Sequence, residues 1–125
     1  LVTALIESGQ IDPLCREHIA PFYRDRRQRA LEIAEQALAG TGARIHEPEG
    51  AFFLWLELPP LVGGTTALYR RLKARGVLVL PGKAFFGNAP VAEREKDRCL
   101  RVSCAQPDAV LERGFAAIAE EAARA

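Results

Sequence analysis

The chain of 125 residues contains no methionine and begins with Leu1, so we expect it to be a fragment of a longer protein. The chain also lacks an excess of charge of one sign. Seventeen basic and sixteen acidic residues give a formal net charge of +1, which excludes a strong overall field toward nucleic acid or an acidic membrane. No stretch approaches the roughly twenty apolar residues that a membrane-spanning helix needs. We therefore expect a soluble chain with no membrane or nucleic-acid partner.

Cysteine is scarce, and its three positions form no paired framework. Cys15, Cys99 and Cys104 are odd in number, which favours buried thiols in a reducing cytoplasm over disulfides. Cys15 and His18 have the two-residue gap that occurs in zinc sites. No second pair completes such a site and His46 stands alone, so we expect no metal.

Apolar residues make up 49% of the chain and charged residues 26%, which is typical of one folded domain with a single core. Their spacing predicts an α/β chain of the α+β sandwich type, with about four strands packed against helices. The predicted helices cover 12–20, 22–39, 68–75 and a last segment after 108, and the predicted strands cover 43–46, 52–58, 77–80 and 99–105.

Local signals define several features of these elements. Asp12 and Pro13 are typical of a helix start, and Pro21 should break or kink that helix. The strand 52–58 has two mostly apolar faces, so we expect it to be covered on both sides. We expect 77–80 to be a short buried strand, and the charged part of the following loop to be exposed.

Four arginines gather near the start of the long predicted helix, with an aspartate among them. On a helix these side chains point in different directions, so they are typical of a solvated face. The arginines are Arg24, Arg26, Arg27 and Arg29.

Arg101 is the residue that most needs a partner, because it lies in the apolar stretch 99–105. Alternation along a strand puts Arg101 and Ser103 on the face opposite Leu100. A carboxylate of a ligand would match the two-pronged guanidinium. The alternative, which the residues alone favour, is a structural ion pair with Glu57 or another acid at the sheet surface.

The loop 81–87 directly follows a predicted strand, where loops of α/β sheets reach ligands. Gly82 and Gly87 permit close approach of the backbone, and Phe85 or Phe86 could line a pocket for a small aliphatic side chain. The alternative is a turn followed by two core aromatic residues.

Three stretches resemble, in this order, the C-terminal small domain of the pyridoxal-phosphate-dependent aminotransferases of fold type I, class I/II. The stretches are 50–59, 68–86 and 100–105. The long helix that carries Tyr23 also resembles the segment that links the large and small domains of that family. The resemblance therefore implies that residues 1–20 are the end of the large domain or a linker helix, and that residues 21–125 are the small domain.

The middle stretch is most similar to family members that exchange amino groups among alanine, valine and their 2-oxo acids, pyruvate included. The resemblance implies a cytoplasmic homodimer that uses pyridoxal 5'-phosphate. It also implies that Arg101 binds the α-carboxylate of the substrate, and we expect Gly82 and Phe85 of the loop 81–87 to be substrate-binding residues as well. Holding that carboxylate by two prongs fixes the rotation of the substrate, so its Cα–H bond can stand perpendicular to the cofactor ring.

The family carries its cofactor on a lysine that shortly follows a serine, and Lys73, Lys83 and Lys96 all lack that motif. The family also places its phosphate-binding groups and the aspartate under the pyridine nitrogen in the large domain. We therefore expect no catalytic residue in this chain, and we expect the chain alone to be inactive.

Two other functions stay open at this point. In one, the chain senses an effector within a transcription regulator that fuses a DNA-binding head to an aminotransferase-like body. In the other, it is a free-standing amino-acid-binding module. The roles of Tyr23, Arg24 and Arg27 are open as well, between contact with an active site and plain helix packing or solvation.

Overall fold

The computed structural model describes residues 1–124. Helices and strands alternate along the chain after a helical N-terminal third. The elements are α1 (Val2–Glu7), α2 (Ile11–Leu14), the π-helical turn η1 (Cys15–Ile19), α3 (Ala20–Leu38), β1 (Arg44–His46), β2 (Phe53–Glu57), α4 (Gly64–Ala74), β3 (Leu80–Pro81), the 3-10 turn η2 (Gly82–Phe85), α5 (Glu93–Lys96), β4 (Cys99–Ser103) and α6 (Asp108–Ala122).

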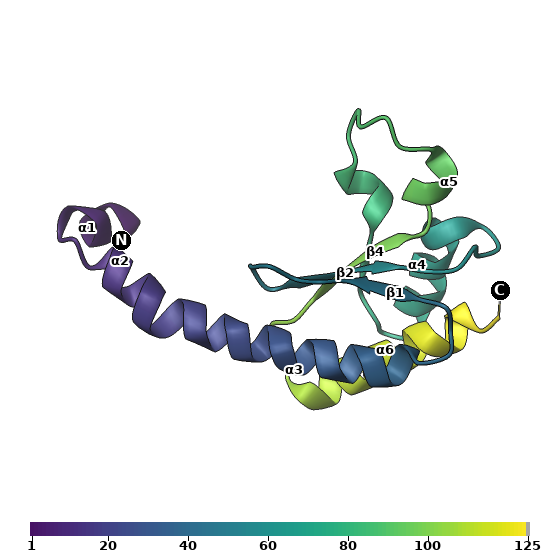
Figure 1. Ribbon diagram of the computed structural model, residues 1–125, viewed down its shortest axis with the longest axis horizontal. Helices are drawn as coiled ribbons and strands as arrows, with labels where there is room; N and C mark the ends of the chain where they lie inside the picture. Colours follow the sequence, from purple (N-terminus) through teal and green to yellow (C-terminus); the bar gives the residue numbers. More distant parts are fainter. Residues whose placement is uncertain (125) are drawn as a thin grey trace.

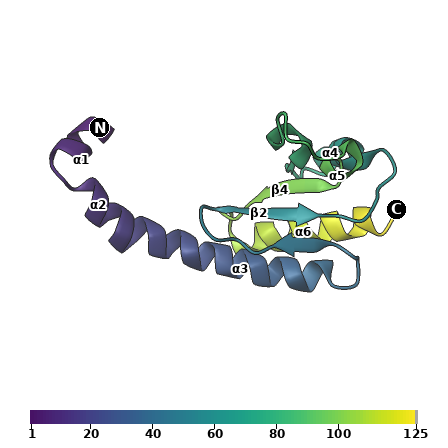
Figure 2. The same ribbon diagram turned by 45° about the horizontal axis from the view of Figure 1, so that its top comes forward.

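The strands form one antiparallel sheet in the order β1-β2-β4-β3. Helices α3 and α6 run side by side along one face of this sheet (Figure 1). The segment that carries η2 and α5 rises on the opposite side, as the turned view shows (Figure 2). The predicted sandwich of about four strands and packed helices is confirmed.

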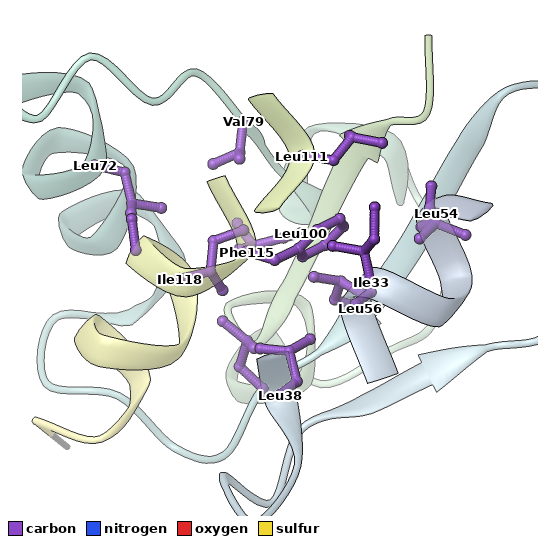
Figure 3. Close-up of a cluster of buried hydrophobic side chains, with 14 of the residues drawn as sticks. Ile33, Leu38, Leu54, Leu56, Leu72, Val79, Leu100, Leu111, Phe115 and Ile118 are labelled. Atoms are coloured by element: carbon purple, nitrogen blue, oxygen red, sulfur yellow. The ribbon is translucent and has the colours of Figure 1, made fainter. Parts of the chain in front are cut away.

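The core lies between the sheet and the two long helices. Leu54 and Leu56 of β2 and Leu100 of β4 have no exposed surface, and Leu100 lies at the centre of the cluster (Figure 3). The helices contribute the apolar face that their 3.6-residue period predicts. Their buried side chains include Ile33 and Leu38 from α3 and Leu111, Phe115 and Ile118 from α6.

The helix does not break at Pro21, contrary to the prediction of a break, but it changes its winding there. The chain stays helical from Ile11 to Leu38 through the π-helical turn η1. A proline clashes with the carbonyl four residues before it, and a wider turn relieves that crowding. Residues 1–19 bury no side chain, and α3 carries them away from the sheet (Figure 1).

The predicted buried strand 77–80 is wrong for most of its length. Only Leu80 and Pro81 pair, and they do so with β4 alone, because β3 is an edge strand. An edge segment with one packed side exposes alternate residues. Val79 is accordingly buried, whereas Leu78 is 74% exposed.

The loop after β3 is also more ordered than predicted, because it contains η2 and α5. The charged part is not a purely solvated excursion. The Lys96 side chain is only 11% exposed, and the carbonyl of Asp97 accepts a hydrogen bond from the main-chain N–H of Thr65 at the start of α4.

The four clustered arginines stay at least partly exposed, as predicted of a solvated face, but three of them also contact the segments that precede β2 or follow β4. Arg24 alone is exposed without such a contact. Arg29 Nε lies 2.9 Å from Asp108 Oδ2, and Arg26 and Arg27 donate to the main-chain carbonyls of Gln106 and Ala51.

An ion cluster joins α4 to α6. Glu121 is 2% exposed, and its carboxylate accepts hydrogen bonds from Arg71, Arg75 and Arg124 at 2.7, 3.2 and 3.0 Å. Burial by itself would raise the pKa of Glu121, but the guanidinium groups outweigh it and hold that pKa below its ordinary value. Within residues 1–124, every helix is too short or too polar to cross a bilayer.

Replacing Leu100 by Ala should lower the free energy of unfolding by about 2–5 kcal/mol, because it leaves a cavity at the centre of the core. Val62→Ala is the control, since Val62 is 80% exposed and its loss should cost less than about 0.5 kcal/mol. Urea unfolding followed by circular dichroism measures both. Equal effects would contradict the described core.

The Glu121 cluster predicts a pH dependence of stability. A carboxylate whose folded pKa is depressed adds stability above its unfolded pKa, and that stability is lost as the pH falls through the folded pKa. Glu121→Gln should therefore destabilise the protein at neutral pH, and the deficit should narrow as the pH falls below 4.5. Urea unfolding across the acid range measures this, and a deficit that stays constant would exclude the mechanism.

Candidate functional site

Arg101 lies on the face of the sheet that points away from α3 and α6, which we call the open face. In the register of β2 and β4, Trp55 is opposite Arg101 and Leu56 is opposite Leu100. Neighbouring residues of a strand point to opposite faces. The buried Leu100 therefore directs Arg101 to the open face, as alternation predicted.

Two aromatic rings hold the guanidinium of Arg101. Its Cζ atom is 4.1 Å from the ring centroid of Phe53 and 4.1 Å from that of Phe85. Its Nε atom is buried and has no hydrogen-bond partner. Within residues 1–124, no acidic side chain forms an ion pair with Arg101.

The structural ion pair between Arg101 and Glu57, which the residues alone favoured, is wrong. Glu57 Oε2 is 2.7 Å from Arg44 Nη2, and Glu57 Oε1 is 3.3 Å from Arg98 Nη2. Glu57 is opposite Cys99 in the register, so these two arginines are nearer to it. The Arg101 donors are thus left for an anion from outside, and a planar carboxylate fits them in two-pronged form.

Aromatic side chains surround Arg101 on the open face. The rings of Phe85 and Phe86 meet the ring of Trp55 edge-on, at centroid distances of 6.0 and 5.7 Å. Trp55 and Phe53 are half-buried and Phe85 is 46% exposed, so the expectation of a strand fully covered on both sides is wrong. The segment that carries η2 and α5 lies on this side (Figure 2), and neither loop phenylalanine belongs to the described core cluster.

Gly82 brings the η2 segment close to β4. A Cβ atom at this position would clash with the Cβ of Cys99 and would lie 2.9 Å from the Cys99 carbonyl carbon and oxygen. Only glycine permits this approach. The close contact sets the distance at which η2 carries Phe85 over the open face.

The long helix also supports the aromatic surface. Tyr23 packs on Phe52 with ring centroids 5.0 Å apart, and Phe52 packs on Phe53 at 4.6 Å. Ala51 has the left-handed φ of 57°, which is uncommon for a residue other than glycine. Arg27 donates a 3.3 Å hydrogen bond to its carbonyl, so α3 holds the turn before Phe52 and Phe53. The sequence showed no signal for this contact.

All three lysines of the chain have partners. The hydrogen bond to Glu93, with Nζ and Oε2 2.9 Å apart, raises the pKa of Lys83. Lys96 also pairs with Glu93, and Lys73 lies over the ring of Tyr69. A lysine must lose its proton before it can bond to a carbonyl carbon. The ion pair of Lys83 therefore disfavours the uncharged amine that covalent attachment of a carbonyl compound needs.

A cavity of about 710 Å³ lies between α6 and the segment before β3. Val77, Val110 and Gly114 are in its mostly apolar lining, and Arg101 is not. The cavity and Arg101 therefore lie at different places in the fold.

The cysteines offer no reactive centre. Cys99 and Cys104 are buried, as expected of reduced thiols, and burial raises the pKa of Cys104 to about 11. Cys15 is exposed on η1. Over residues 1–124, no three His, Cys, Asp or Glu side chains gather as the ligands of a metal would.

Three comparisons relate this geometry to known proteins. The profile of the family "Aminotransferase class I and II" matches residues 1–118. Valine–pyruvate aminotransferase of Escherichia coli (strain K12) is 36% identical over 125 residues, which are 100% of this chain and 30% of that protein. The crystal structure of valine-pyruvate aminotransferase from Salmonella typhimurium LT2 superimposes with a TM-score of 0.86 at 36% identity, over 97% of this chain and 31% of that one.

A more distant structure carries a bound compound. It is the α-aminoadipate aminotransferase from Thermus thermophilus, complexed with N-(5'-phosphopyridoxyl)-L-leucine, which has a TM-score of 0.68 and 27% identity over 98% of this chain and 29% of its own. The chain spans about a third of the length of these relatives. The profile match and the identity over the whole chain show that it belongs to the class I and II aminotransferase family.

Proposed function

We propose that this chain is the small domain of an aminotransferase that moves an amino group between an aliphatic amino acid, valine or alanine, and a 2-oxo acid such as pyruvate. In this proposal Arg101 binds the α-carboxylate that both substrates share. The observation that carries the proposal is a guanidinium that lies against two rings, with a buried Nε that has no hydrogen-bond partner and no ion pair to an acid in the described chain. Two relatives named valine-pyruvate aminotransferase support the choice of substrates.

The relatives named above are aminotransferases, which favours an enzyme over a transcription regulator or a free-standing binding module. The pyridoxyl compound in the Thermus enzyme supports pyridoxal 5'-phosphate as the cofactor. Because the lysines of this chain are all partnered, its attachment site belongs to another part of the whole protein. The chain alone is then inactive, and the whole protein is a cytoplasmic homodimer.

The domain boundary at residues 20 and 21 is part of the same proposal. Residues 1–19 bury no side chain, which suits the end of a large domain or a linker helix that packs elsewhere. From Pro21 onward α3 joins the sheet through Tyr23 and Arg27. Residues 21–125 form the small domain.

The residues of this chain bind and orient the substrate. Two parallel hydrogen bonds from Arg101 fix both the position and the rotation of a carboxylate. The rings of Phe53, Trp55 and Phe85 surround the ion pair with apolar surface, which limits the access of water and strengthens the attraction.

Arg101→Ala in the full-length enzyme should lower kcat/KM for alanine and valine on the order of 100-fold, because two hydrogen bonds to a charged group are lost. Arg101→Lys should recover only part of this, since an ammonium cannot bind in two-pronged form. Steady-state kinetics measure the effect, and the absorbance spectrum of the bound cofactor serves as the control. Unchanged kcat/KM with an intact spectrum would refute the proposal.

Gly82→Ala should raise KM for the amino acid several-fold, because the added Cβ pushes η2, and with it Phe85, away from β4. The same clash should cost about 1–3 kcal/mol of stability, as overpacking usually does. Gly50→Ala is the matched control, since a Cβ there meets nothing within 4 Å. Kinetics and urea unfolding of both variants test the role of Gly82, and equal behaviour would contradict it.

A further inference from the structure

We propose that Phe53 and Phe85 are positioning residues that take the place of an acidic counter-ion for Arg101. They hold the guanidinium by its faces and so leave its N–H donors to the carboxylate of the substrate. The inference rests on the proposed function of Arg101 and deepens it, because it names what keeps that side chain available.

The two rings approach Arg101 from different sides. Strand β4 lies between β2 and β3 in the sheet. Phe53 comes from β2, and Phe85 comes from η2, which directly follows β3. Each ring centroid is 4.1 Å from Cζ, well inside the range of about 6 Å over which a cation is attracted to an aromatic face.

Both rings are themselves held in place. Phe53 packs against Phe52 at 4.6 Å between centroids, and Trp55 meets Phe85 edge-on at 6.0 Å. The η2 segment that carries Phe85 is further tied to α5 by the ion pair between Lys83 and Glu93. The contacts of Phe53 and Phe85 with Arg101 are therefore supported by neighbouring residues on both sides.

The open face contains the opposite arrangement two residue pairs along the ladder, at Glu57. There Glu57 neutralises Arg44 and Arg98 through short ion pairs. An acid beside Arg101 would occupy the same donor edge that a substrate carboxylate needs. Aromatic rings attract the charge through the flat faces of the guanidinium and leave that edge open. The rings can thus support Arg101 without competing with the ligand.

The test replaces Phe85 in the full-length enzyme with phenylalanines of increasing fluorination, which keep the ring shape but weaken its attraction for cations. We expect KM for alanine and valine to rise stepwise, reaching about fivefold to thirtyfold, with a smaller change in kcat. The KM of Phe85→Tyr should stay near the parent value, and the KM of Phe85→Leu should equal that of the variant with the most fluorinated ring. The same series at Phe53 should give the same trend.

The controls separate the charge effect from packing. An amine substrate without a carboxylate should show no trend along the fluorine series, because it makes no use of Arg101. Phe22→Leu removes a ring from an exposed position of α3 that lies against Tyr23 and Arg26, and should leave KM unchanged. Phe85 is 46% exposed and the fluorinated rings keep its shape, so folding should be preserved.

The outcomes are distinct. A KM that is flat along the series, while Arg101→Ala keeps its large effect, would overturn the counter-ion role and leave the proposed function intact. An equal trend with the amine substrate would assign the rings to packing and would also overturn it. If Arg101→Ala itself has no effect on KM, the proposed function fails, and this inference fails with it.

Discussion

The alternation of side chains in β4 is the constraint on which the rest of the structure depends. Leu100 must be in the core and Arg101 must be outside it, and the two are neighbours. A slip of one residue in the pairing with β2 would exchange them and bury a guanidinium among leucines. The core residues of α3 and α6 therefore fix the direction of Arg101 as firmly as they fix the fold (Figure 3).

Two kinds of electrostatic environment meet on the open face. Glu57 is enclosed by Arg44 and Arg98, so its charge is satisfied inside the protein. Arg101 lies two residue pairs along the ladder and has two rings against its guanidinium, so its charge is only partly compensated. A guanidinium in such surroundings has a strong preference for an anion that arrives from outside. This asymmetry is the basis on which we propose Arg101, and not Arg44 or Arg98, as the residue that binds a ligand.

The long helix connects this site to the N-terminal residues. Tyr23 and Arg27 tie α3 to the turn before Phe53, and Arg29 ties it to the start of α6 through Asp108. The same helix extends beyond the sheet and carries residues 1–19, which bury no side chain in the described chain (Figure 1).

The sequence by itself determined the longer helices α3, α4 and α6, most of the sheet and the face on which Arg101 lies, because periodicity and Gly or Pro boundaries depend only on near neighbours in the chain. It also contains the stretch 100–105, whose resemblance to the family suggested a role for Arg101. The tertiary structure decided the partners. Rings from β2 and η2, and not Glu57, lie against Arg101, and an edge position exposes Leu78 and Leu80, because such contacts join residues far apart in sequence and arise only on packing.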